Sequence, residues 1–263
     1  NINFGIQKII MATFNRRGYK KSKNLKADQV EKSQTAEVFD SLDSTANKSE
    51  QWIIKNQTKI FSAIALIAIS VLSFLGYQRF ISEPKEIEAI SELNQAQYFF
   101  EQALISSESD SLFKLALNGG EGKYGFLDIT KEYSGTKAAN LANYSIGMAY
   151  LNLEEYENAI TYLEKFKSDD ILLKSISLGT IGDCFSELNQ SKKAYEYYQK
   201  AFKQNDNIYT TPKYLFKAAL IGSELGEYKS SINFLNRIKE EYPDSYESGL
   251  VEVQLGRIEN LIN

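Results

Sequence analysis

The stretch NYSIGMAYLNLEEYENAITYLEKF, residues 143–166, recurs in altered form twice more before the end of the chain. It aligns with LGTIGDCFSELNQSKKAYEYYQKA at residues 178–201 and more loosely with LFKAALIGSELGEYKSSINFLNRI at residues 215–238. The small residues Gly147 and Gly182 occupy the same place in the first two copies, 35 residues apart. A period of this length indicates stacked helical units, each of which buries its apolar face against its neighbours.

Each copy predicts two helices of about a dozen residues, with small residues where the two helices cross. In the second helix the small positions are Ala159, Ala194 and Ser231. The second interval is 37 residues and the first is 35, so we expect a small insertion before the first helix of the third unit. Pro243 predicts the end of that unit's second helix, because proline lacks the amide hydrogen that a helix interior needs.

The order of apolar, small, aromatic and closing proline positions resembles the tetratricopeptide repeat, which has a 34-residue period. The first two units fit well, whereas the third has Gly222 where the aromatic residue should stand. The resemblance implies an all-α fold with an α-solenoid of about three to four helix pairs. We expect leading helices over residues 87–105 and a final helix from about Ser245 to Ile262.

A membrane anchor is predicted ahead of the repeats. Nineteen residues from Ile60 to Gln78 carry no formal charge and are nearly all apolar, which is about the length that a helix needs to cross a bilayer. We expect one juxtamembrane and transmembrane helix over residues 49–82, ending or restarting at Pro84. A cleaved signal peptide is disfavoured, because the segment starts late in the chain and Arg79-Phe80-Ile81 is no small-residue cleavage site.

Charge predicts the orientation of this anchor. Residues 1–59 carry a net charge of +5 and the remaining residues a net charge of −9. By the positive-inside rule the N-terminus is cytoplasmic. We therefore expect residues 1–48 to be a cytoplasmic, mostly disordered basic tail, and residues 83–263 to be a periplasmic helical domain in a bacterial inner membrane. Within the tail, Met11 is a candidate natural start of the chain.

The basic cluster of the tail lies at Arg16, Arg17, Lys20, Lys21, Lys23 and Lys26. Binding of nucleic acid would favour aromatic residues among these charges, on which bases stack. The cluster has no such interleaving, so we interpret it as a solvated signal for membrane topology and expect no nucleic-acid partner.

Composition excludes many enzyme mechanisms. The chain has no histidine, so it lacks an imidazole base, a Ser-His-Asp triad and the usual zinc ligand. Its one cysteine, Cys184, cannot form an intramolecular disulfide and is expected to be a packed thiol. We expect no catalytic residue, no metal and no cofactor.

The glycine-rich stretch LNGGEGKYGF, residues 117–126, is the one candidate for phosphate binding. A P-loop needs glycine six residues before its lysine and a hydroxyl residue after it, but Leu117 and Tyr124 occupy these places around Lys123. The preceding DSLFKLAL also has helical character, whereas a P-loop follows a strand. Because Gly125 lies 34 residues before Ala159, we interpret the stretch as the turn of a degenerate leading repeat.

Stacked helix pairs form a superhelix whose concave face is lined by the first helix of each pair. With Gly147, Gly182 and Ala219 taken as equivalent, groove-facing positions fall three residues before, one after and four after each. The candidate peptide-groove residues are Tyr144, Met148, Leu151, Gly179, Asp183, Ser186, Phe216, Leu220 and Ser223. This mix favours an extended or helical apolar peptide as ligand, unless the leading or final helices cover part of the face.

The wider arrangement is similar to the single-pass, periplasm-facing ancillary subunits of the bacterial Sec translocon. The similarity rests on EQWIIKNQTK at residues 50–59, the apolar span, EPKEIEAISELNQAQYFFEQAL at residues 83–104 and the repeats. It implies translocon subunits, a periplasmic chaperone or secretory clients as protein partners. A structural scaffold of another envelope complex has the same layout, so both functions stay open at this point, as does the oligomeric state.

Overall fold

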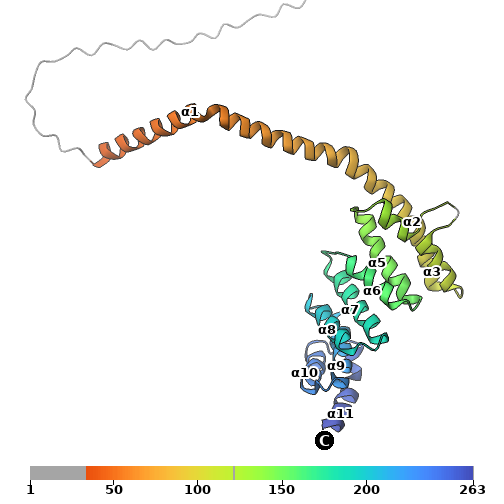
Figure 1. Ribbon diagram of the computed structural model, residues 1–263. Coiled ribbons are helices and arrows are strands. Elements are labelled where there is room, and N and C mark those ends of the chain that lie inside the picture. The colour runs from red at the N-terminus through yellow and green to blue at the C-terminus, as the bar shows by residue number, and fades with distance from the viewer. Residues whose placement is uncertain (1–33, 121, 263) are drawn as a thin grey trace, which may run out of the picture. The chain divides into compact units, whose positions relative to one another are not determined.

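The computed structural model describes residues 34–120 and 122–262. Within these ranges the chain is all-helical and has no strand (Figure 1), which confirms the predicted fold class. The chain divides into two compact units after Ala68, and the repeats belong to the second. The predicted start at Met11 and the basic cluster at 16–26 lie outside the described residues.

The first helix, α1, spans Gln34–Tyr77, and a π-helical turn at Gln78–Ser82 leads into α2, Glu83–Ile105. α1 therefore begins fifteen residues before the predicted start, and residues 34–48 are helical where we expected a disordered tail. Hydroxyl groups of polar side chains bond to carbonyls one turn earlier, as Thr45 does to Ser41 at 2.7 Å. Pro84 does not interrupt the helix, which runs from Glu37 to Ile105, and it stands in the first turn of α2 directly after the π-helical turn.

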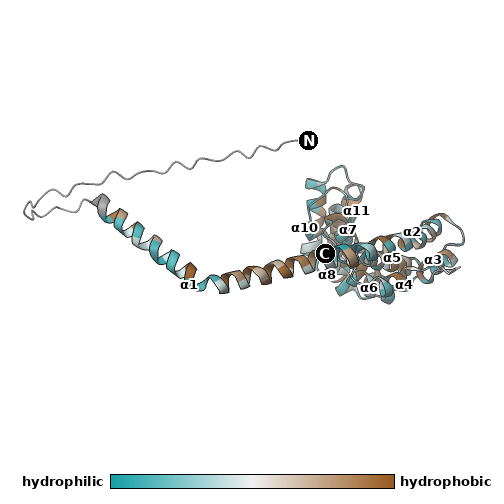
Figure 2. Ribbon diagram, turned by 90° about the horizontal axis from the view of Figure 1, so that it is seen from above, coloured by the Kyte–Doolittle hydropathy of each residue, from teal (hydrophilic) through white to brown (hydrophobic). Residues whose placement is uncertain are grey.

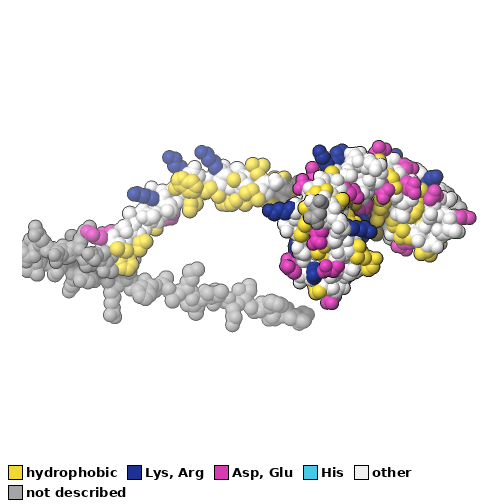
Figure 3. Space-filling view, turned by 90° about the horizontal axis from the view of Figure 1, so that it is seen from below, with side chains coloured by type: hydrophobic (Ala, Val, Ile, Leu, Met, Phe, Trp, Pro, Cys, Tyr) yellow, Lys and Arg dark blue, Asp and Glu magenta, His cyan; other side chains and the backbone are white. Residues whose placement is uncertain are grey.

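The apolar part of α1 is exposed along its length. Figure 2 shows hydrophobic residues concentrated in the second part of this helix, and in Figure 3 yellow side chains cover the same stretch between basic residues. None of its most apolar 18-residue window is buried in the structure, whereas a core helix of a soluble protein would be mostly buried. By length and composition this helix is able to cross a membrane.

Three consecutive helix pairs follow the predicted repeats. Their helices are α5 (Lys137–Asn152) with α6 (Tyr156–Lys165), α7 (Ile171–Glu187) with α8 (Ser191–Lys203), and α9 (Thr211–Glu224) with α10 (Tyr228–Glu241). Each second helix contacts the first helix of the next pair. The connection 204–210 is two residues longer than the connection 166–170, which confirms the predicted insertion in the third unit.

The turn inside each pair has the same backbone conformation. Glu154, Asn189 and Gly226 stand at equivalent positions, and all three have positive φ, at 60°, 55° and 81°. In the first turn the amide of Glu155 donates to the carbonyl of Tyr150 at 2.8 Å, and equivalent bonds of 2.8 and 2.7 Å close the other two. Because glycine adopts this conformation most readily, the third turn carries its most suitable residue.

Small residues lie where the helices of a pair cross, as predicted. A Cβ atom added at Gly147 would lie 2.4 Å from Cγ of Leu163, and one added at Gly182 would lie 2.7 Å from Cδ1 of Tyr198. The facing alanine of α6, Ala159, is fully buried. Any larger residue at these crossings would separate the helix axes.

The glycine-rich stretch is a turn between α3 (Ser109–Asn118) and α4 (Phe126–Glu132), as we expected. Gly119 ends α3 with φ of +75°. A Cβ atom on Gly125 would lie only 2.2 Å from the backbone nitrogen of Gly119. Gly119 and Gly125 are therefore needed for a close approach of two backbone segments, which accounts for these two glycines without a phosphate.

The end of the chain differs slightly from the prediction. α10 ends at Glu241, just before Pro243, as predicted. A 3₁₀ turn at Glu247–Leu250 then precedes the last helix, α11, Val251–Ile262. α11 starts six residues later than expected, because residues 245–248 form tighter i to i+3 bonds, such as Ser248 to Ser245 at 3.2 Å.

Candidate protein-binding groove

A cavity of about 540 Å³ opens between the first helices of the three pairs, α5, α7 and α9. We call it the first-helix groove. Of the nine residues predicted to face a groove, Leu151, Asp183, Ser186 and Leu220 line this cavity. Three successive repeats therefore bring side chains that are far apart in sequence to one surface, which is the geometry that binds an extended partner.

Asp183 is the best-connected polar residue of the first-helix groove. Its Oδ1 atom accepts a hydrogen bond of 2.7 Å from the hydroxyl of Tyr198 on α8. The same atom accepts from Nζ of Lys217 on α9 at 2.6 Å. The carboxylate thus joins three helices of two successive repeats and holds the floor of the groove in one arrangement.

Tyr198 acts here as a fixed hydrogen-bond donor. Its ring is buried, and burial followed by the nearby Asp183 carboxylate raises the pKa of its hydroxyl well above the usual value. The hydroxyl therefore keeps its proton at neutral pH. It positions the Asp183 carboxylate and is unsuited to serve as a general base.

Three further residues of the first-helix groove stand five positions after Gly147, Gly182 and Ala219. The prediction from sequence did not include this position. They are Asn152 on α5, Glu187 on α7 and Glu224 on α9. Each follows a predicted +1 position by four residues, so helical periodicity was the signal that could have found them. Glu187 and Glu224, together with Glu154, make the rim of the groove acidic.

Tyr144 and Met148 belong to a different cavity. With residues of α2 they line a space of about 340 Å³ between α2 and α5. The ring of Tyr144 also packs against Phe166, with centroids 5.1 Å apart. The leading helix α2 therefore borders this end of the predicted face, which is one of the two alternatives that the sequence allowed.

Gly179, Phe216 and Ser223 do not line the first-helix groove. Gly179 is buried beneath Tyr214, and a Cβ atom on it would lie 2.0 Å from Cε1 of that ring. Its prediction as a groove-facing residue is wrong, because an aromatic side chain from α9 covers it. Phe216 is partly buried against the main core, and the Ser223 hydroxyl donates to the carbonyl of Leu220 at 2.8 Å.

The one thiol of the chain is not exposed in the groove. Cys184 is fully buried, and burial is the main cause that raises the pKa of its thiol to about 12. A thiol with this pKa is neutral at physiological pH and is a poor nucleophile. In the part of the chain that the structure describes, no three acidic or cysteine residues are grouped to hold a metal ion.

Comparison with protein families identifies the three helix pairs. A tetratricopeptide repeat model matches residues 142–168 and 176–208, and a second tetratricopeptide repeat model matches residues 214–245. The chain contains tetratricopeptide repeats. No curated protein matches the chain in a sequence comparison. Tetratricopeptide repeats (TPRs) are in general non-enzymatic modules for protein–protein interaction, and the three matched TPRs are the pairs that form the first-helix groove.

Proposed function

We propose that this chain is a non-enzymatic, membrane-anchored TPR protein that binds a protein partner in its first-helix groove. The observation that carries the proposal is the cavity of about 540 Å³ formed by the first helices of all three TPRs. Its size falls in the range of ligand-binding clefts. Its apolar lining includes Leu151, Leu220 and Ile221, which are suited to bury apolar side chains of a peptide.

The acidic residues at the rim of the first-helix groove favour a ligand that carries positive charge. Glu154, Glu187 and Glu224 line the groove, and within the described residues none of their carboxylates forms an ion pair. A partner segment that combines apolar side chains with Lys or Arg would complement them. We therefore propose an apolar peptide with basic flanks, in a helical or extended conformation, where the sequence alone indicated only an apolar one.

We further propose that residues 60–78 span a bacterial inner membrane, with residues 1–48 cytoplasmic and residues 83–263 periplasmic. Support comes from the exposed apolar part of α1 and from the excess of basic residues before it. In this location the groove would meet secretory proteins, translocon subunits or periplasmic chaperones. The proposed role is to assist Sec-dependent export or to recruit a chaperone.

The experiment is chemical crosslinking of the tagged full chain in native membranes, followed by mass spectrometry. We expect translocon or periplasmic chaperone subunits to be enriched relative to an unrelated single-span protein of equal abundance. Equal recovery of these subunits with both proteins would contradict the proposed role in export.

A structural scaffold of another envelope complex is the second candidate. The last helix favours it, because Val253, Leu261 and Ile262 expose more than half of their surface at the end of the TPR stack. Such apolar residues suit assembly against another protein. One stoichiometric envelope partner, together with normal export after deletion of the gene, would support this function over the first.

A further inference from the structure

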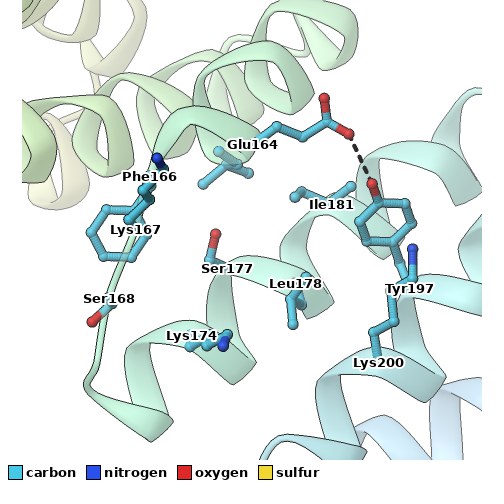
Figure 4. Close-up of a pocket in the computed structure, with 11 residues that line it drawn as sticks. Glu164, Phe166, Lys167, Ser168, Lys174, Ser177, Leu178, Ile181, Tyr197 and Lys200 are labelled. Atoms are coloured by element: carbon cyan, nitrogen blue, oxygen red, sulfur yellow. Dashed lines mark hydrogen bonds between the residues drawn. The ribbon is translucent and has the colours of Figure 1, made fainter.

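A second cavity of the TPR domain lies between α6, α7 and α8 and has a volume of about 470 Å³ (Figure 4). We call it the α6–α8 pocket. It takes residues from α7 that point away from the first-helix groove: Ile181 lines the pocket and Asp183 lines the groove. Residues two apart on a helix point about 200° apart, so the two cavities occupy opposite sides of α7.

The floor and walls of the α6–α8 pocket are apolar. Leu163 and Ile181 are buried at its base, and Phe166 and Leu178 are partly buried beside them. The connection after α6 is held at the edge by paired bonds, in which Lys167 N donates to Asn140 Oδ1 at 2.9 Å and Asn140 Nδ2 donates to Lys167 O at 2.6 Å. The pocket is therefore a formed feature whose edge is fixed to α5.

Three lysines surround this apolar floor. Lys167, Lys174 and Lys200 line the pocket from three different segments, and within the described residues none has a carboxylate within 4.0 Å. The Nζ atom of Lys200 lies 4.1 Å from the ring centroid of Tyr197. The only lining carboxylate, Glu164, accepts a bond of 2.8 Å from the Tyr197 hydroxyl. Positive charge at the rim thus exceeds negative charge by two.

Ser177 places a hydroxyl group in the wall of the α6–α8 pocket. It is only 5 % exposed, and Figure 4 shows its hydroxyl directed into the pocket. Among the described residues this hydroxyl has no hydrogen-bond partner, whereas the fully buried Ser175 donates to the carbonyl of Ala201 at 3.1 Å. Among the described residues the fully buried side-chain atom without a partner is Ser231 Oγ, so the Ser177 hydroxyl is open to solvent through the pocket. An acceptor atom of a ligand would replace water there.

We propose that the α6–α8 pocket is a second docking site, which binds an acidic segment of a partner protein. One large apolar side chain of that segment fills the floor, and an oxygen of its backbone or of a carboxylate accepts from Ser177. Flanking Asp or Glu residues meet Lys167, Lys174 and Lys200. The charge preference is opposite to that of the first-helix groove, so the two cavities take different segments.

The test measures fluorescence polarisation of labelled peptides with the full chain in detergent micelles. The probes are blocked pentapeptides of sequence EDXDE, in which X is Leu, Ile, Phe, Tyr or Trp. Peptides with X replaced by Ala, and with all four acidic residues replaced by Lys, serve as comparisons. We expect at least one EDXDE peptide to bind, the Ala and Lys peptides to bind more weakly, and added salt to weaken binding.

Variants locate the binding. K174E/K200E should lower the affinity about tenfold or more, and Ser177→Ala should lower it several-fold. The matched control K114E/K192E changes the net charge equally at exposed lysines outside the pocket and should leave the affinity unchanged. Leu220→Asp, in the first-helix groove, should also leave it unchanged, so failure of one site is distinguished from failure of the other. Circular dichroism checks that each variant is folded.

Several results would overturn the proposal. The first is that no EDXDE peptide binds. The second is that K174E/K200E and the control K114E/K192E lose affinity equally. The third is that the Ala peptide binds as tightly as the EDXDE peptides. Self-association of the chain that K174E/K200E abolishes would show instead that a second copy occupies the pocket.

Discussion

The carboxylate of Glu86 caps the helix that begins at Lys137. Its Oε2 atom accepts from the backbone amide of Lys137 at 2.7 Å, and its Oε1 atom accepts from the amide of Ala138 at 2.9 Å. Thr136 Oγ1 accepts from the next amide, Ala139, at 3.0 Å. Three free amides of α5 are thereby satisfied, two of them from α2. The first helix of the groove is fixed in this way to the helix that follows the apolar segment.

Replacing Glu86 by Ala should therefore destabilise the helical domain by about 0.5–2 kcal/mol, because the exposed amide of Lys137 and the partly buried amide of Ala138 lose a charged cap. Urea unfolding of the full chain in detergent, followed by near-ultraviolet circular dichroism of the tyrosines, measures this change. Glu101→Ala on the exposed side of α2 is the control and should change stability little. Equal effects of the two substitutions would contradict the capping role.

A methyl group at Gly179 should be costly. Gly179→Ala places Cβ against the buried ring of Tyr214, at 2.0 Å before relaxation, and overpacking of this kind costs about 1–3 kcal/mol. Gly256→Ala in α11 is the matched control, because nothing lies within 4 Å of the added atom. Alanine favours helix over glycine by about 0.5–1 kcal/mol, so the control should be more stable than the natural chain. Loss of stability in both variants, or in neither, would contradict this packing.

The hydrogen bond between Tyr198 and Asp183 should be measurable by a double-mutant cycle. Asp183→Ala leaves the buried Tyr198 hydroxyl without its acceptor and should cost about 1–3 kcal/mol. Tyr198→Phe in the same chain should recover part of that loss, which gives a coupling free energy of about 1 kcal/mol. Additive effects in urea unfolding would show that the bond contributes nothing. Lys217→Met should change stability less, because the pair is about one-third exposed.

Much of the fold follows from small residues in the sequence, and the misses have physical causes. Gly147 and Gly182 predicted the helix crossings, because only small side chains fit there. The groove prediction failed at Gly179, because the long Tyr214 side chain reaches it from the next repeat. The spacing of residues within one helix cannot predict a contact made by the next repeat. It could have predicted Glu187 and Glu224 as groove residues, because they follow Asp183 and Leu220 by one helical turn.

The start of α1 shows a different cause. Residues 34–48 are mostly polar and were expected to be disordered, yet their hydroxyl groups bond within the helix, as Ser44 does to the carbonyl of Ser41 at 2.9 Å. Val38 and Leu42 also lie one turn apart on one face. The polar composition indicated disorder, whereas the spacing of the apolar residues along the segment was compatible with a helix.

The TPR domain should lose stability in alkaline solution. Burial, followed by the Glu88 carboxylate, raises the pKa of Tyr133 to about 12, and burial raises the pKa of Cys184 to about 12. In unfolded chains these groups lose their protons near pH ~10 and ~8.5. At a pH between the unfolded-state pKa and the folded-state pKa of a group, the folded state binds more protons than the unfolded state. The free energy of unfolding therefore falls as pH rises through this range.

Urea midpoints measured at rising pH should therefore decrease above pH ~9. Tyr133→Phe should reduce the slope of this decrease, since one of the groups with a raised pKa is then absent. A midpoint that stays constant or rises over this range would contradict the assignment of raised pKa values to buried groups.

The central claim, that the first-helix groove binds a protein partner, is tested most directly by site-specific photocrosslinking in native membranes. A photoreactive amino acid is placed at Leu151 or Leu220 in the groove, and at Tyr246, which is 81 % exposed and does not line it. We predict that both groove positions give the same discrete crosslinked partner and that Tyr246 does not. Absence of an adduct at both groove positions, or the same adduct at all three, would contradict the claim.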